Sequence, residues 1–264
     1  MRLFRIVSLH LQNIFHHRLR SFVWFLIPLM NNLTVILFWS GAIKNTSQNA
    51  AWTMSTITTY YFLLTIINSM LNSYIQEDVA EFDIKQGDLV RYLTRPFPYY
   101  WIKFIEEIPY RILQGSYGII LIIIFSFFYK NYIIISNKPI IILLSIPIMI
   151  LALFLSFTLK MNLGLSAFWF KDSRSFFELV TIIIIIFSGG VMPLFLLPQG
   201  LQTISSILPF AYTAYFPILS LQGNLSYIQL IRVIGIQCLW LAVFIAINRI
   251  MWKYGIKQFT SFGQ

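Results

Sequence analysis

The acidic residues of this 264-residue chain are pooled in one short segment. Seven of the nine aspartates and glutamates fall between Glu77 and Glu107, while the chain as a whole is 58% hydrophobic and has a mean hydropathy of +0.75. A soluble protein needs charged residues over its whole surface. The distribution therefore predicts a membrane protein with several spans and one substantial polar loop in water.

Six apolar segments have the length of a membrane span, because a helix needs about 20 apolar residues to cross about 30 Å of hydrocarbon. They are roughly residues 21–42, 53–74, 112–129, 139–160, 175–193 and 229–250. No small-residue cleavage site follows the first, so we expect a retained span and not a signal peptide. The sequence thus predicts an all-α integral membrane protein with six transmembrane helices in a single domain, residues 1–264.

Lysine and arginine are distributed unequally between the loops of this arrangement. Fourteen of them lie in the segments on one side of the membrane, and the opposite loops hold only Lys44, Lys130 and Lys138. Because lysine and arginine accumulate in cytoplasmic loops, we expect both termini in the cytoplasm and the loops near Asn49 and Asn137 outside. The net charge of +10 then reflects topology and not nucleic-acid binding.

Residues 1–20 are predicted to form an amphipathic helix at the membrane interface. Most apolar residues of its segment 3–15 share one helical face, although Ile6 and Leu9 lie off it, and arginine, glutamine and asparagine side chains lie opposite, as in interfacial helices. The three histidines of the chain, His10, His16 and His17, have no cysteine or carboxylate neighbours. A metal site is therefore not expected.

The fourth apolar segment is longer than a span requires. From Pro139 to Phe170 it is nearly continuously apolar, interrupted by Lys160. Either the helix projects into the cytoplasm beyond Lys160, or it bends near Asn162–Gly164. We expect projection, with the lysine reaching the inner membrane interface.

The segment 189–227 carries no charge and is broken by glycines and prolines. Proline removes backbone hydrogen bonds that hydrocarbon cannot replace, so a single spanning helix is excluded. An ordinary extracellular loop, the alternative, would be polar. We expect a re-entrant outer helical hairpin between spans 5 and 6. The residues predicted to form an outer gate there are Ser188, Gly189, Gly190, Pro193, Pro198, Pro209 and Phe210.

The polar loop, residues 75–111, contains the signals of a short cytoplasmic helix. Asp88 is a candidate N-cap after Gly87, and Pro96 ends the helix. Three apolar side chains share one of its faces: Leu89, Tyr92 and Leu93. They pack either against the chain's own helices or into a groove on a cytoplasmic partner, and the residues alone leave these alternatives even.

Three short motifs follow one another along the chain. They are Ile84-x-x-Gly87-x-Leu89-x-x-x-Leu93-x-Arg95-Pro96, the run from Ser188-Gly189-Gly190 through Pro193, Pro198, Leu208-Pro209-Phe210 and Pro217 to Gly223, and the ending Trp252-Lys253-Tyr254-Gly255. Their order and spacing resemble the ABC-2-type transporter permeases, the small six-span subunits of bacterial ABC exporters. With the amphipathic N terminus, the resemblance covers essentially the whole chain.

This resemblance implies a permease subunit of an exporter in the bacterial cytoplasmic membrane. Such an exporter contains a second permease, identical or related, and two copies of a cytoplasmic ABC ATPase, whose cleft receives a coupling helix between spans 2 and 3. The docking residues would be Gln86, Gly87, Asp88, Leu89, Val90, Arg91, Tyr92, Leu93 and Arg95. The sequence has no Gly-x-x-x-x-Gly-Lys-Ser/Thr phosphate loop, so ATP and magnesium are expected on the ATPase and no cofactor on this chain.

An intramembrane lipid-modifying enzyme and a non-transport membrane scaffold are the alternatives. A metalloprotease would need His-Glu-x-x-His, but no histidine follows His17. Glu106 and Glu107 are adjacent and thus on different helix faces, and Glu178 is expected to pair with Arg174 at the interface. No catalytic residue is therefore predicted, and a scaffold would not explain the proline-rich hairpin.

Polar residues within the spans are few, and four asparagines are candidates for a substrate path: Asn31, Asn32, Asn68 and Asn72. Hydrogen bonding between helices is the more frequent role of such residues and is the alternative here. The spans carry no deep carboxylate, which argues against proton-coupled transport and favours an amphiphilic or lipid-like cargo.

Overall fold

The computed structural model is helical throughout the residues that it describes, 18–43, 53–71, 74–128 and 134–259, and no strand occurs in these ranges. The long helices are α2 (Arg18–Ile43), α3 (Met54–Leu71), α6 (Tyr99–Phe128), α7 (Pro139–Leu165), α8 (Ser173–Phe187) and α11 (Tyr227–Gly255). The short ones are α4 (Ile75–Glu77), η1 (Asp78–Lys85), α5 (Val90–Leu93), η3 (Ser166–Phe168), η4 (Leu194–Leu196), α9 (Gln199–Ile207), η5 (Pro209–Tyr212) and α10 (Tyr215–Gln222). The predicted interfacial helix, residues 1–20, lies almost entirely outside the described ranges.

Each predicted span overlaps one of the six long helices, although α8 ends before the predicted span 175–193 does and α6 begins well before the predicted span 112–129. Among the described residues, three helices are long and apolar enough to cross a membrane: Tyr99–Phe125, Pro139–Phe168 and Tyr227–Gly255. The described part of α2 is apolar over Phe25–Gly41 only, α3 carries several threonines and serines, and α8 has 15 residues. The all-helical, multi-pass membrane class is confirmed, and the count of six spans stays a prediction.

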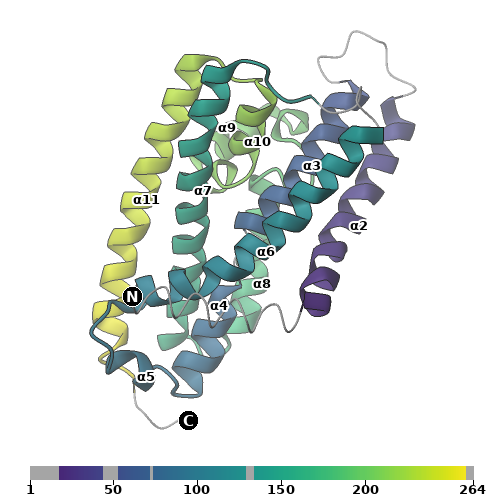
Figure 1. Ribbon diagram of the computed structural model, residues 1–264. Helices are drawn as coiled ribbons and strands as arrows, with labels where there is room; N and C mark the ends of the chain where they lie inside the picture. Colours follow the sequence, from purple (N-terminus) through teal and green to yellow (C-terminus); the bar gives the residue numbers. More distant parts are fainter. Residues whose placement is uncertain (1–17, 44–52, 72–73, 129–133, 260–264) are drawn as a thin grey trace.

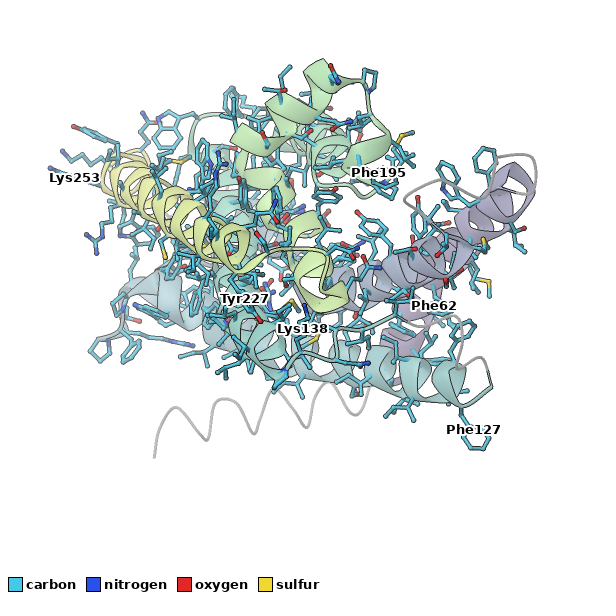
Figure 2. All side chains as sticks on the ribbon, turned by 90° about the horizontal axis from the view of Figure 1, so that it is seen from above. Phe62, Phe127, Lys138, Phe195, Tyr227 and Lys253 are labelled. Atoms are coloured by element: carbon cyan, nitrogen blue, oxygen red, sulfur yellow. The ribbon has the colours of Figure 1, made fainter. Side chains whose placement is uncertain are left out.

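Figure 1 shows the arrangement of the bundle. α7 and α11 lie side by side on one flank, and α2, α3 and α6 form the other. α9 and α10 lie at one end, whereas α5, the start of α2 and the end of α11 lie at the opposite end. In the view from above, Lys138 and Tyr227 mark the neighbouring starts of α7 and α11, and Lys253 lies at the far end of α11 (Figure 2).

The main core lies between α3, α7, α10 and α11. Its fully buried side chains include Tyr60, Tyr61, Leu64, Ile148, Leu155, Ile218 and Leu230. Gln237 of α11, also fully buried, donates hydrogen bonds to the carbonyl oxygens of Ile148 (3.1 Å) and Tyr212 (3.0 Å). One amide therefore joins α11, α7 and the hairpin segment, satisfying backbone groups that an apolar interior would leave unpaired.

Within the predicted polar loop over 75–111, α6 already begins at Tyr99, so the last part of that segment is helical. The charges in the first half of α6 are paired along the helix. Arg111 forms an ion pair with Glu107 at 2.6 Å and donates to the Leu71 carbonyl oxygen at the end of α3, at 3.1 Å. Paired charges allow a helix to extend well beyond its apolar part.

α7 continues without a break past Lys160 to Leu165, as predicted, and the alternative bend near Asn162–Gly164 does not occur. Asn162 instead accepts a hydrogen bond from Asn248 of α11 at 2.8 Å. Gly164 permits a close crossing with η1, since a Cβ at this position would lie 2.8 Å from the Cβ of Val79.

Candidate functional site

A buried ion pair holds the polar end of the bundle together. η1 is a π-helix. This form is rare in proteins, and the instances that do occur are frequently at functional sites. Its Asp83 lies 2.5 Å from the Lys103 ammonium of α6 and accepts a hydrogen bond from the Tyr99 hydroxyl at 2.5 Å. Asp83 and Lys103 are both buried. Because breaking one side of such a pair costs about 3–5 kcal/mol, these contacts fix η1 onto α6.

The same cluster extends to α5. The Lys103 ammonium lies 3.7 Å from the Glu106 carboxylate and 4.5 Å from the ring centroid of Tyr92. The Tyr92 hydroxyl donates to Glu106 at 3.3 Å, and burial raises the pKa of this hydroxyl. Tyr92 is thus a neutral donor at physiological pH and ties the inner face of α5 to α6.

The segment around α5 has an inner and an outer face. Leu89 is 0% exposed and packs with Val79 and Tyr99 in a core of this chain. Of the two alternatives, Leu89 therefore packs against the chain's own helices and does not face a partner. Val90 and Leu93, 40% and 43% exposed, point away from this core. Together with exposed Phe97, they form a surface that we call the α5 patch.

Asp88 is not the N-cap that the sequence predicted. α5 begins at Val90, so Leu89 occupies the N-cap position and no side chain caps the helix. Asp88 lies one residue before that position and pairs with Arg91. Gly87 makes the preceding turn with φ 84°, a conformation that glycine adopts without steric cost. Of the other predicted docking residues, Gln86, Arg91 and Arg95 are exposed, and Tyr92 is partly buried. α5 ends before Pro96, as predicted.

A cavity of about 260 Å³ lies between α2, α3, α7 and α8 and reaches the segment after α8. Asn31, Asn32 and Asn68 line it, and Asn72 lies outside the described residues. Asn32 donates to the Thr65 hydroxyl at 2.7 Å, so the helix-pairing alternative holds for this residue. The amides of Asn31 and Asn68 make no hydrogen bond to any residue that the structure describes, and both face the cavity.

A second cavity, of about 830 Å³, adjoins the first on the side of α4 and the start of α8. Lys160 and Thr181 line both. The expectation that Lys160 reaches the inner membrane interface is wrong, because its side chain is 7% exposed and lies inside the bundle, where α4 and α8 cover this part of α7. Glu178 pairs with Arg174 at 3.6 Å, as predicted, and both side chains are exposed.

The turn after α8 closes the opposite end of the smaller cavity. Gly189 has φ 81° and accepts a hydrogen bond from the buried Tyr60 hydroxyl at 2.8 Å. The Tyr61 hydroxyl donates to the Val191 carbonyl oxygen at 3.1 Å. Gly190, which with Ser188 lines the cavity, has an ordinary φ. Two tyrosines of α3 therefore hold the turn, and Gly189 is the position that requires glycine.

The rest of segment 189–227 forms the short helices that were expected, with a bend of 70° between α9 and η5. Pro193 and Pro198 directly precede η4 and α9, and Pro209 is the first residue of η5, where partly buried Phe210 follows it. Trp240 of α11 donates to the Ile207 carbonyl oxygen at the bend, at 3.0 Å. The broken backbone is thus packed against protein, as apolar surroundings require.

Sequence reasoning missed the contacts that hold this site together. The carboxylate-rich segment signalled a polar cluster, but nothing in it identified Asp83 and Lys103 as the buried pair. In the sequence, Tyr60 and Tyr61 look like ordinary residues of a span. Their roles could not be predicted, because their hydroxyls donate to carbonyl oxygens 129 and 130 residues away in the chain. Such pairings depend on how α3 packs against the turn that follows α8.

A family model described as "ABC-2 family transporter protein" matches residues 29–263. That range contains the α5 patch, the larger cavity, the whole of segment 189–227 and every residue that lines the smaller cavity except Pro28. The comparison with curated proteins found no match.

Proposed function

The chain belongs to the ABC-2 transporter family, and from this premise we propose that it is the six-span permease subunit of an ABC exporter. Membership in the family supports a membrane transport component that associates with an ABC ATPase. We further propose two copies of that ATPase, which bind ATP and magnesium, and a second permease, identical or related. The proposed location is the bacterial cytoplasmic membrane, among its lipids and without nucleic acid.

The observation that carries the proposal is the α5 patch. Val90, Leu93 and Phe97 are exposed apolar side chains at a polar end of the bundle, where unpaired apolar surface marks a protein contact. The buried Asp83–Lys103 pair fixes the neighbouring η1 to α6, and Tyr92 of α5 contacts Lys103 and Glu106 of α6. A displacement of α5 by the ATPase would therefore be transmitted to α6, a long helix of the bundle, as coupling to an ATPase requires.

The proposed path for the cargo runs through the two adjoining cavities. The larger one lies on the side of α4 and the smaller one ends at Gly190 and Ser188. The hairpin of α9 and α10 would close the outer end, re-entering the outer leaflet as an apolar plug. Open and closed arrangements of this gate would be favoured by different nucleotide states of the ATPase.

Docking is tested with charges placed on the α5 patch. Val90→Asp and Leu93→Asp are expected to reduce co-purification of the ATPase by at least about tenfold, because a charge would enter an apolar groove unpaired. Gln258→Asp, an exposed position elsewhere on the chain, adds the same charge and should bind normally. Leu89→Asp should instead lower the unfolding temperature, since Leu89 is buried. Normal ATPase binding by both patch variants would rule out docking at α5.

Topology is tested by single-cysteine labelling. In a Cys238→Ser background, cysteine placed at exposed Gln86 should react only after the membrane is permeabilised, and cysteine at exposed Asn137 should react in intact cells. The expectation rests on the unequal distribution of lysine and arginine between the loops. It also rests on the position of α5, which lies at the same end of the bundle as the start of α2 and the end of α11 (Figure 1). Labelling of Gln86→Cys from outside would contradict it.

A further inference from the structure

Lys160 is a buried cation inside the bundle. Its side chain is 7% exposed, yet it lines both cavities where they adjoin. Within the described residues, its ammonium has no hydrogen bond and no carboxylate within ion-pair distance. A buried charge without an ion-pair partner is costly and marks a functional position in membrane proteins.

The carboxylates around this lysine form no ion pair with it within the described residues. Glu81 and Glu178, which line the larger cavity, pair with Lys85 at 2.8 Å and with Arg174 at 3.6 Å. Glu107 on α6 pairs with Arg111. Glu77 also lines the larger cavity, but its carboxylate is beyond ion-pair distance of the Lys160 ammonium. The charge of Lys160 is therefore free to meet a ligand that enters the cavity.

The smaller cavity, which Lys160 lines, has both polar and apolar walls. Asn31 and Asn68 offer amides without a described partner, while Leu159, Ile184 and Ile185 supply apolar surface in the same cavity. One cation, a few uncharged donors and an adjoining apolar wall match a molecule with an anionic head and an apolar tail. A small inorganic anion would leave the apolar wall unused.

We propose that Lys160 binds the anionic headgroup of an amphiphilic cargo, with the two asparagine amides contacting the headgroup and the apolar wall contacting the tail. This inference rests on the proposed function and names the class of cargo that the path would take. Phosphate and carboxylate heads share the required chemistry, because either oxyanion accepts charge-assisted hydrogen bonds from an ammonium.

The test measures binding by the purified full chain in a neutral detergent. The probes are short-chain phosphatidic acid, short-chain phosphatidylcholine and inorganic phosphate. Calorimetry measures the affinity of the chain for each of them. The wild type should prefer phosphatidic acid over phosphatidylcholine by about tenfold or more. Lys160→Met should lose this preference and Lys160→Arg should keep it. Lys138→Met removes an exposed lysine at the far end of α7 and should bind as the wild type does.

Thermal unfolding separates binding from a structural role. Lys160→Met should be at least as stable as the wild type, because it removes an unpaired buried charge. A preference for phosphatidic acid that survives in Lys160→Met would overturn the proposal. If inorganic phosphate binds as tightly as phosphatidic acid, the inference that the cargo is amphiphilic is wrong. Neither result touches ATPase docking at the α5 patch, so this proposal and the proposed function fail through different experiments.

Discussion

Lys103→Met is expected to lower the free energy of unfolding by about 3–5 kcal/mol, because it leaves the buried Asp83 carboxylate without its cation. The Tyr99 hydroxyl alone cannot compensate a full charge. The measurement is the midpoint of thermal unfolding in detergent. Lys103 also contacts the ring of Tyr92 on α5. The amount of ATPase that co-purifies with Lys103→Met should therefore be reduced as well.

A second lysine provides the matched control. Lys85→Met removes the Lys85–Glu81 pair, which has a similar length of 2.8 Å but is partly exposed, and should cost no more than about 1 kcal/mol. Adding Asp83→Leu to Lys103→Met should restore much of the lost stability, because the buried carboxylate is then gone. Equal effects of the two single lysine variants would show that burial of the Asp83–Lys103 pair has no special role.

Gly189→Ala is expected to disrupt the turn after α8. A side chain at φ 81° is strained, and the added Cβ would lie 2.5 Å from the Tyr60 hydroxyl oxygen, so the 2.8 Å hydrogen bond to the turn would break. Hydrogen–deuterium exchange over residues 188–197 should rise at least about tenfold. ATP-driven uptake of a fluorescent short-chain phosphatidic acid by inside-out vesicles should be lost.

The controls for this experiment are other glycines and the ATPase. Gly200→Ala should behave as the wild type, because no atom lies within 4 Å of its added Cβ. Gly190→Val should have a smaller effect on exchange than Gly189→Val, since Gly190 has an ordinary φ. ATPase co-purification should stay normal in all of them, as the turn and α5 lie at opposite ends of the bundle (Figure 1). Unchanged exchange and uptake in Gly189→Ala would remove the turn from the gating mechanism.

The sequence by itself determined the features that depend on local chemistry. Long apolar segments form helices wherever they occur, since a helix satisfies its own backbone hydrogen bonds. Proline fixes its own φ and lacks an N–H, so Pro193, Pro198 and Pro209 marked the starts of short helices. The end of α5 before Pro96 follows from the same rule.

Tertiary structure decided which side chains face each other. Leu89 and Leu93 are four residues apart and look equivalent in the sequence, yet one is buried in a core and the other is exposed. Lys103 and Lys160 are both buried lysines, yet one meets Asp83 and the other faces two cavities. Burial and pairing depend on contacts between residues far apart in the chain, and local propensity carries no information about those contacts.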